Sequence, residues 1–217
     1  MGQKINPIGF RIGSYSDWRS NWYYDNKKKF RESLFEDIKI RKYLMSRLNP
    51  AGIVEVEIER LPKSIRLTIT VSRPGVVIGR GGTGIEEVKR GILEVIREVR
   101  KEKIKDLKID LQVNEVKNPE LSAFLVANRI AAELERRIPQ RRVVARVMER
   151  VMGSGAKGIK VVLGGRIGGA EIARRELYHQ GSVPAQTLRA NIDYAHFPAL
   201  LKRGYVGVKV WIHKGAE

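Results

Sequence analysis

A short glycine-rich stretch holds the residues whose types and spacing point most clearly to a chemical role. Residues 77–85 follow the pattern V-I-G-x-x-G-x-x-I and enclose the loop Gly79, Arg80, Gly81 and Gly82. Glycine lacks a Cβ, so such a loop can turn sharply and lie close to a sugar-phosphate backbone. Arg80 adds positive charge where phosphates would lie. The stretch therefore predicts a grip on the backbone of a nucleic acid.

Other phosphate-binding loops share some of these letters. Gly79, Gly81 and Gly84 also spell G-x-G-x-x-G, the dinucleotide fingerprint, which requires a strand–helix–strand unit with parallel strands. The two alternating runs before the loop, residues 53–59 and 65–71, are separated too briefly for parallel pairing and predict an antiparallel hairpin. A Walker loop would need Gly-Lys-Ser/Thr, which does not follow. A plain glycine-rich turn without function stays open as the alternative.

The net charge restricts the class of partner. Lysine and arginine number 42 against 24 acidic residues, which gives +18 at pH 7. Charge of this size favours a polyanion such as a nucleic acid. A membrane surface is the rival, but no run reaches the ~18 apolar residues of a spanning helix. The chain has no cysteine and no apolar leader, so we expect a cytoplasmic protein without disulfides or thiolate metal sites.

Hydrophobic periodicity predicts a first domain over residues 28–117, preceded by an N-terminal arm over residues 1–27. The first helix is expected to bury apolar residues at helical spacing, namely Leu34, Ile38, Met45 and Leu48. The hairpin, a short helix, the glycine loop, a long helix and a third strand over residues 107–113 follow. This order resembles the type II K-homology (KH) domain, a three-stranded sheet with helices. The glycine loop of a KH domain clamps about four single-stranded nucleotides.

Residues 118–217 predict a second α+β domain, with two helices on a mostly antiparallel sheet. Alternating apolar residues indicate strands over 159–163, 188–194 and 206–212. The second helix places Arg142, Arg146 and Arg150 in a row at i+4 spacing. Like charges in such a row repel by a few tenths of a kcal/mol per pair. Bound phosphates that neutralise the arginines would explain why such a row is present. An ordinary solvated basic face is the alternative.

An enzyme is the least supported class of function. The histidines, His179, His196 and His213, are scattered and lack the spacing of metal ligands. No Ser-His-Asp or paired-carboxylate arrangement is suggested, so we expect no catalytic residue, no metal and no cofactor. A free KH regulator that binds particular transcripts is a further alternative.

Several segments outside the glycine loop resemble one family, the third protein of the bacterial small ribosomal subunit. They are Gly2-Gln3-Lys4 with Pro7, Gly9, Arg11 and Gly13, then residues 165–174 (GRIGGAEIAR) and residues 207–212 (GVKVWI). The matches span nearly the whole chain in order. The resemblance implies a structural RNA-binding protein of the head of the small subunit, located where messenger RNA enters.

The resemblance also assigns residues and partners. The family's paired messenger-contacting arginines fall on Arg141 and Arg142, and Arg146 is expected to join them. A lysine that relatives use in messenger unwinding is replaced by Ala145, which leaves that role open. Ribosomal RNA contacts are expected from Lys4, Arg11, Arg136, Arg137, Arg150, Arg166 and Arg174. The implied partners are small-subunit ribosomal RNA, messenger RNA and the tenth, fourteenth and second small-subunit proteins, with the fourth and fifth at the messenger channel.

Overall fold

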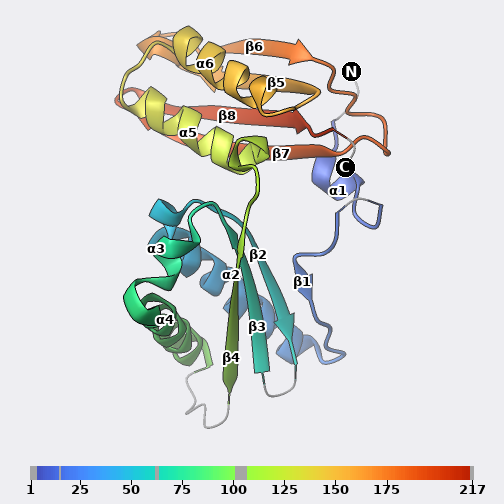
Figure 1. Ribbon diagram of the computed structural model, residues 1–217, viewed down its shortest axis with the longest axis vertical. Helices are drawn as coiled ribbons and strands as arrows, with labels where there is room; N and C mark the ends of the chain where they lie inside the picture. The colour runs from blue at the N-terminus through green and yellow to red at the C-terminus, as the bar shows by residue number, and fades with distance from the viewer. Residues whose placement is uncertain (1–3, 15, 62–63, 101–106, 216–217) are drawn as a thin grey trace. The chain divides into compact units, whose positions relative to one another are not determined.

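The computed structural model describes residues 4–14, 16–61, 64–100 and 107–215, with only the backbone of Arg80 (Figure 1). By its internal contacts the chain divides into two units. One is Trp18–Lys117, and the other joins Met1–Asp17 to Asn118–Glu217. The segment expected to form a separate arm over residues 1–27 is therefore shared between the two units.

The unit Trp18–Lys117 has the element order that the sequence predicted for a type II KH domain. Its elements are β1 (Ser20–Asn21), α2 (Lys27–Arg47), β2 (Ile53–Arg60), β3 (Ser64–Val71), α3 (Pro74–Ile78), α4 (Thr83–Arg100) and β4 (Lys108–Glu115). The sheet has the order β1-β2-β3-β4, in which β2 and β3 form the expected antiparallel hairpin and β4 runs parallel to β3. The predicted α+β fold is confirmed, and the two-residue β1 adds a short fourth strand.

Helix α2 buries a different face from the one predicted. Leu34 and Ile38 are 43% and 53% exposed, whereas Glu36 and Asp37 are almost completely buried. Only the C-terminal part of the expected face, represented by Leu48, lies inside. The prediction was wrong because it rested on the spacing of the apolar residues alone, which does not show that Glu36 and Asp37 are buried.

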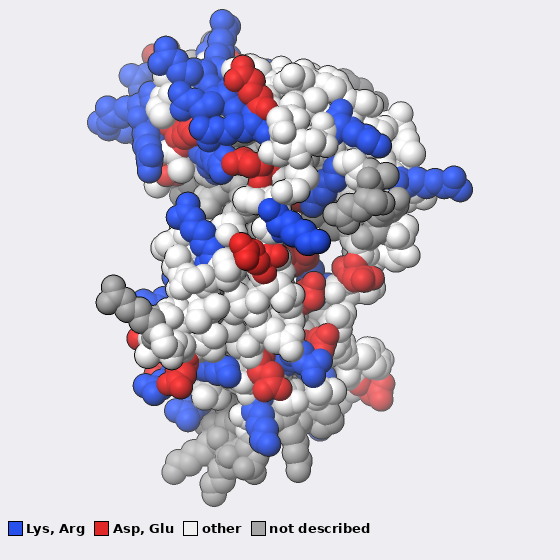
Figure 2. Space-filling view, in the orientation of Figure 1, with Lys and Arg blue, Asp and Glu red and all other residues white. Residues whose placement is uncertain are grey.

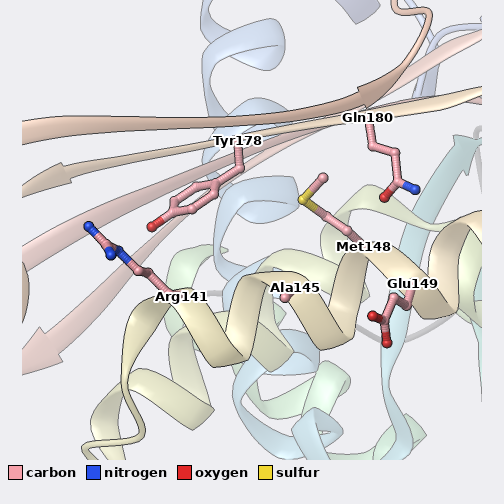
Figure 3. A pocket seen from close by; sticks show the side chains of 6 residues that line it. All are labelled: Arg141, Ala145, Met148, Glu149, Tyr178 and Gln180. Carbon is pink, nitrogen blue, oxygen red and sulfur yellow. The ribbon is translucent and has the colours of Figure 1, made fainter.

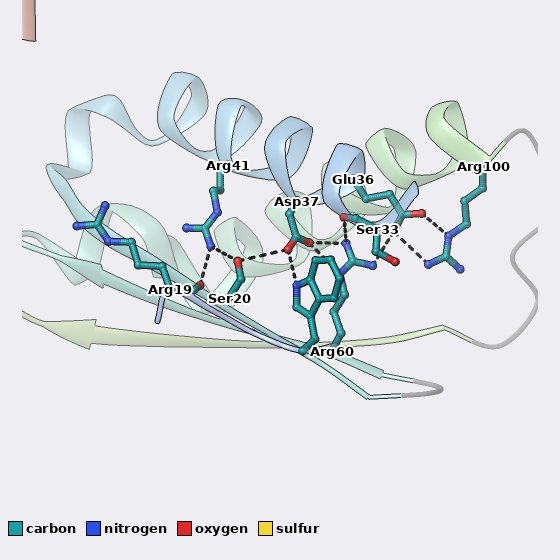
Figure 4. Close-up of polar contacts among 9 residues, drawn as sticks. Arg19, Ser20, Ser33, Glu36, Asp37, Arg41, Arg60 and Arg100 are labelled. Carbon is teal, nitrogen blue, oxygen red and sulfur yellow. Dashed lines mark hydrogen bonds and ion pairs between the residues drawn. The ribbon is translucent and has the colours of Figure 1, made fainter. Parts of the chain in front are cut away.

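A buried arginine on β2 explains this orientation of α2. Arg60 donates from Nη1 to Glu36 Oε2 at 2.7 Å and from Nε to Asp37 Oδ1 at 2.8 Å (Figure 4). Trp22 donates to Asp37 at 2.7 Å, and Arg100 of α4 donates to Glu36 at 2.5 Å. A buried charge is tolerated only when it is paired, so the arginine on the sheet turns the acidic side of α2 inward.

The second unit places two helices on an antiparallel sheet, as predicted. Its elements are α1 (Pro7–Phe10), α5 (Ala123–Glu135), α6 (Gln140–Gly153), β5 (Gly158–Gly165), β6 (Arg174–Gly181), β7 (Ile192–Leu201) and β8 (Gly204–His213). The sheet order is β6-β5-β8-β7, with every neighbouring pair antiparallel. Helices α5 and α6 cover one face of this sheet (Figure 1). The core between them is aliphatic and includes Ile130, Val147, Ile159 and Val208.

The strand expected over residues 188–194 begins later than predicted. Strand β7 starts at Ile192, and residues 182–191 form an irregular segment with turns. Carbonyl groups of this segment, those of Ala185, Thr187 and Ala190, accept hydrogen bonds from the side chain of Arg11. Those carbonyls therefore face a side chain and not a neighbouring strand.

Strand β6 was not predicted. Only Leu177 and Tyr178 among its residues are large and apolar, and they are adjacent in the sequence. No alternation of apolar and polar residues therefore signals a strand. The strand is held by its pairing with β5 at the edge of the sheet.

Candidate nucleic-acid interface

The glycine loop lies between α3 and α4, and each glycine has a separate reason to be there. Gly79, Gly81 and Gly82 have φ angles of 70°, 64° and 83°, which favour glycine. A Cβ on Gly79 would lie 2.9 Å from Gly84 N, and one on Gly84 would lie 2.5 Å from Val77 O. These two glycines let α3 and α4 approach one another.

The other two glycines leave the tip of the loop open. A Cβ on Gly81 or Gly82 would meet no atom within 4 Å, so packing does not select glycine there. The positive φ does, and it leaves bare backbone that a phosphate can approach closely. The side chain of Arg80, predicted to sit among these phosphates, lies outside the described part of the structure.

Apolar side chains beside the loop were not recognised from the sequence as site residues. Val76 is 52% exposed and Ile78 is 39% exposed, whereas Val77 between them is buried. Exposed aliphatic residues next to a backbone-gripping loop offer contact area to sugars or bases. The signal was present in the sequence, because a single turn of helix cannot bury three consecutive apolar residues.

Helix α6 carries the predicted arginines on two different flanks. Arg142, Arg146 and Arg150 are exposed, and Arg146 Nη1 lies 3.8 Å from Glu133 Oε2 of α5. Arg141 instead lies on the flank toward β6, together with Ala145. Arg146, which was expected to join Arg141 and Arg142, is therefore on a different side of the helix from Ala145.

A hollow of about 370 Å³ separates this flank of α6 from strand β6 (Figure 3). It is lined by Arg141, Ala145, Met148, Glu149, Tyr178 and Gln180. Burial, followed by a hydrogen bond to Glu176, raises the pKa of Tyr178 to about 12. Its hydroxyl therefore stays a hydrogen-bond donor at neutral pH, with Oη 2.7 Å from the Glu176 carboxylate.

Lysine and arginine side chains gather at one end of the second unit (Figure 2, upper left). Arg136 and Arg137 are exposed in the turn between α5 and α6, and Glu135 just before them accepts from Leu200 N near the end of β7. At the same end of the sheet, Arg174 pairs with Gly165, the residue before Arg166. The fold thus brings together cations that lie far apart in the sequence.

Not every predicted contact residue is accessible. Lys4 is exposed. Arg11 is 1% exposed and donates to four backbone carbonyls, those of Pro7, Ala185, Thr187 and Ala190. Its burial lowers its pKa from the ordinary value. The guanidinium is therefore unavailable to a phosphate in this structure, and we assign it a structural role in place of the expected RNA contact.

The described part of the chain contains neither a candidate metal centre nor a candidate membrane span. No group of three or more histidine, aspartate or glutamate residues could hold a metal ion there. No helix in that part is long and apolar enough to cross a membrane.

Comparison with known families assigns both halves of the chain. The KH domain family matches residues 39–121, and the family described as "Ribosomal protein S3, C-terminal domain" matches residues 130–212. The first of these ranges contains the glycine loop, and the second contains the arginines of α6.

Individual relatives match along almost the full length. "Small ribosomal subunit protein uS3" of Persephonella marina is 49% identical over 99% of this chain and 91% of its own length. The protein of the same name from Clostridium novyi is 46% identical over 99% of this chain and 93% of its own length. Identity of this extent, together with the two domain matches, shows that the chain belongs to the uS3 family of ribosomal proteins, a structural and non-enzymatic family.

Proposed function

We propose that this chain is a structural component of the small ribosomal subunit. It binds small-subunit ribosomal RNA in the head and contacts messenger RNA where the message enters. The observation that carries the proposal is the match to relatives named as small-subunit proteins over 99% of the chain. The open glycine loop and the cationic end of the second unit are the surfaces that such a role requires.

The proposed mechanism is electrostatic. Lysine and arginine neutralise phosphates and release the counterions condensed on RNA, which supplies affinity without reading the base sequence. The bare backbone at Gly81 and Gly82 admits a phosphate, and Val76 and Ile78 offer apolar contact beside it. The KH unit thereby holds a single strand by its backbone.

Messenger contact is assigned to the flanks of α6. Arg141 and Arg142 lie on different flanks of the helix, so together they carry positive charge to both flanks. Arg146 has Glu133 at 3.8 Å and contributes a partly compensated charge. Ribosomal RNA contacts are assigned to Lys4, Arg136, Arg137, Arg150, Arg166 and Arg174.

The protein partners in this proposal are the tenth, fourteenth and second proteins of the small subunit, and the fourth and fifth at the messenger channel. The cellular location is the cytoplasm, on the ribosome. These assignments follow from membership of the family.

The test is co-purification from the source cells. Tagged full-length protein should bring down small-subunit RNA in stoichiometric amount and should sediment with small subunits in a sucrose gradient. Sedimentation as a free protein, with a few selected transcripts bound, would instead indicate the KH regulator and overturn the proposal.

A further inference from the structure

The sheet of the second unit has a face that neither α5 nor α6 covers. Core residues of β5 and β8, such as Val161 and Val210, point toward the helices, so their neighbours Lys160, Lys209 and Trp211 point the other way. We call this side the outer face. Helix α1 contacts β7, and its C-cap Arg11 bonds to Ala190 just before that strand begins.

Charges are sorted between the two faces of this sheet. Among the four strands, all of which are described, the acidic residues are Glu176 and Asp193, and both point to the helix side. Glu176 accepts from Tyr178, which lines the hollow beside α6, and Asp193 accepts from the backbone N of Ala123 in α5. Every charged side chain that these strands present on the outer face is therefore basic.

The strand register arranges the outer face in rungs. One rung runs His179, Lys160, Trp211, Tyr194 across the four strands. The rings of Tyr194 and Trp211 lie 5.0 Å apart, and Lys160 Nζ lies 5.6 Å from the centre of the Trp211 ring. All three side chains are partly exposed. Aromatic rings bordered by cations are a surface on which bases stack while phosphates are neutralised.

The next rungs extend this surface with charge and open space. Lys209 and His196 face each other across β8 and β7, and both are exposed. One rung further, exposed Arg175 pairs with Gly164, which in turn pairs with Gly207. Successive rungs are about 7 Å apart along the strands, so the cations lie within reach of the phosphates of a nucleotide stacked on the rings.

A bound ligand explains the glycine at position 164 better than the fold does. It is absent from the glycines with positive φ, and a Cβ at this position would meet no atom within 4 Å. Neither backbone conformation nor packing therefore requires glycine there. Glycine inside a strand costs stability and often marks a place where a ligand or another backbone comes close.

The cations also crowd one another when no ligand is bound. Burial lowers the pKa of Lys160, and the neighbouring charges of Lys4 and Arg175 lower it further. Lys4 belongs to the N-terminal segment, so two distant parts of the chain bring positive charge to the same place. A bound polyanion would relieve this repulsion.

We propose that the outer face of this sheet is a second RNA-binding surface, on which Trp211 and Tyr194 stack the bases of an unpaired RNA segment while Lys160, Lys209 and Arg175 neutralise its phosphates. The inference rests on the proposed RNA-binding function and assigns it a surface separate from the glycine loop and from α6. Four-stranded sheets with aromatic residues on an open face bind single-stranded RNA in this manner in another protein class. An acidic protein segment is the competing occupant, but it would not require the aromatic pair.

The test uses the full chain and a fluorescently labelled uridine decamer. Trp211→Leu should weaken binding about tenfold, which is the loss expected for one stacked base. Lys160→Ala with Lys209→Ala should weaken binding and reduce the slope of log K against log salt by roughly 1.4, or about 0.7 per phosphate contact. Gly164→Val should weaken binding without loss of stability, because a β-branched residue suits a strand.

A matched control removes two lysines from the other unit. Lys39→Ala with Lys42→Ala, both exposed on α2, has the same change in net charge and should alter affinity less than twofold. Quenching of Trp211 fluorescence by the decamer, taken as the difference between the wild type and Trp211→Leu, should appear with single-stranded RNA and be much weaker with an RNA duplex.

The outcomes separate this inference from the function on which it rests. If the wild type binds the decamer but the outer-face variants bind equally well and Trp211 is not quenched, the outer face is not an RNA surface and the proposed function stands. Equal quenching by duplex RNA overturns the stacking role. Outer-face variants that keep RNA affinity but lose an acidic ribosomal protein would assign the face to that protein. If the wild type binds no RNA at all, the proposed function itself fails.

Discussion

Arg11 donates from Nε to the carbonyl oxygen of Ala190 at 2.7 Å, and these residues are 179 positions apart in the sequence. The same guanidinium holds the carbonyls of Pro7, Ala185 and Thr187. One buried cation thus connects the N-terminal segment to the irregular segment before β7. This explains why residues 4–14 belong with the C-terminal unit and why β7 starts only at Ile192.

Replacing Arg11 should destabilise the second unit specifically. Arg11→Ala removes two buried and two partly buried hydrogen bonds, and each hydrogen bond to a charged group contributes about 1.5–3 kcal/mol. We expect a loss of about 3 kcal/mol or more in the free energy of unfolding, measured by urea denaturation. Arg189→Ala, an exposed neighbour of Ala190, is the control and should change it by less than about 0.5 kcal/mol. Equal effects of the two substitutions would contradict the role of Arg11.

The Arg60 cluster predicts a second sharp contrast, this time in the KH unit. Arg60→Ala removes the cation that Glu36 and Asp37 share, while both carboxylates stay buried. Breaking a buried ion pair in this way costs about 3–5 kcal/mol. Arg66→Ala on the adjacent strand breaks an exposed pair with Glu59 at 3.1 Å and should cost less than about 1 kcal/mol. Chemical denaturation of both variants gives the comparison. A loss below about 1 kcal/mol for Arg60→Ala would refute the proposed importance of the cluster.

Acid should weaken the same cluster through Glu36. Burial opposes the charge of this carboxylate, but hydrogen bonds from Arg100 and Arg60 outweigh it and lower the pKa of Glu36. A lowered native pKa stabilises the fold above the pKa of the unfolded state, about 4.3, and that contribution disappears as the pH falls through the native pKa.

Glu36→Gln should therefore be less stable than the wild type at pH 7, and the difference should shrink below about pH 4. Thermal unfolding measured from pH 7 to pH 3 provides the data. Glu86→Gln, at an exposed position on α4, should run parallel to the wild type throughout. A difference between Glu36→Gln and the wild type that stays constant with pH would show that hydrogen bonding, and not ionisation, accounts for it.

The elements that the sequence predicted well are those in which local pattern and tertiary environment agree. The hairpin of β2 and β3 alternates apolar residues on its buried side, and the V-I-G-x-x-G-x-x-I pattern fixes the turn between α3 and α4. The row of arginines on α6 could be predicted because i+4 spacing depends only on helix geometry. What each flank of α6 faces could not be predicted, because it depends on which neighbours α6 packs against.

The elements that the sequence predicted poorly depend on distant partners. Strand β6 has no apolar alternation and exists because β5 pairs with it. The face that α2 buries depends on Arg60, a residue 23 positions beyond Asp37. Amphipathicity alone would place the charges of Glu36 and Asp37 in solvent. Arginine is a residue type that commonly contacts phosphates, and the sequence gives no sign that Arg11 is buried. Its burial depends on carbonyl groups of the loop 174–179 positions further along the chain, to which it donates.

The two flanks of α6 give the last prediction, which concerns messenger binding. Arg141→Ala with Arg142→Ala removes charge from both flanks, so affinity for a single-stranded messenger should fall and the salt slope should flatten by roughly 1.4 if each arginine contacts one phosphate. Arg146→Ala should have a smaller effect, because Glu133 at 3.8 Å already offsets that charge. Filter binding of an unstructured message to small subunits that carry each variant, at low and at high salt, measures both quantities. Lys39→Ala with Lys42→Ala controls for net charge. A double arginine variant with unchanged affinity and an unchanged slope would remove α6 from the path of the message, and a larger loss for Arg146→Ala than for the pair would assign contact to the flank that faces α5.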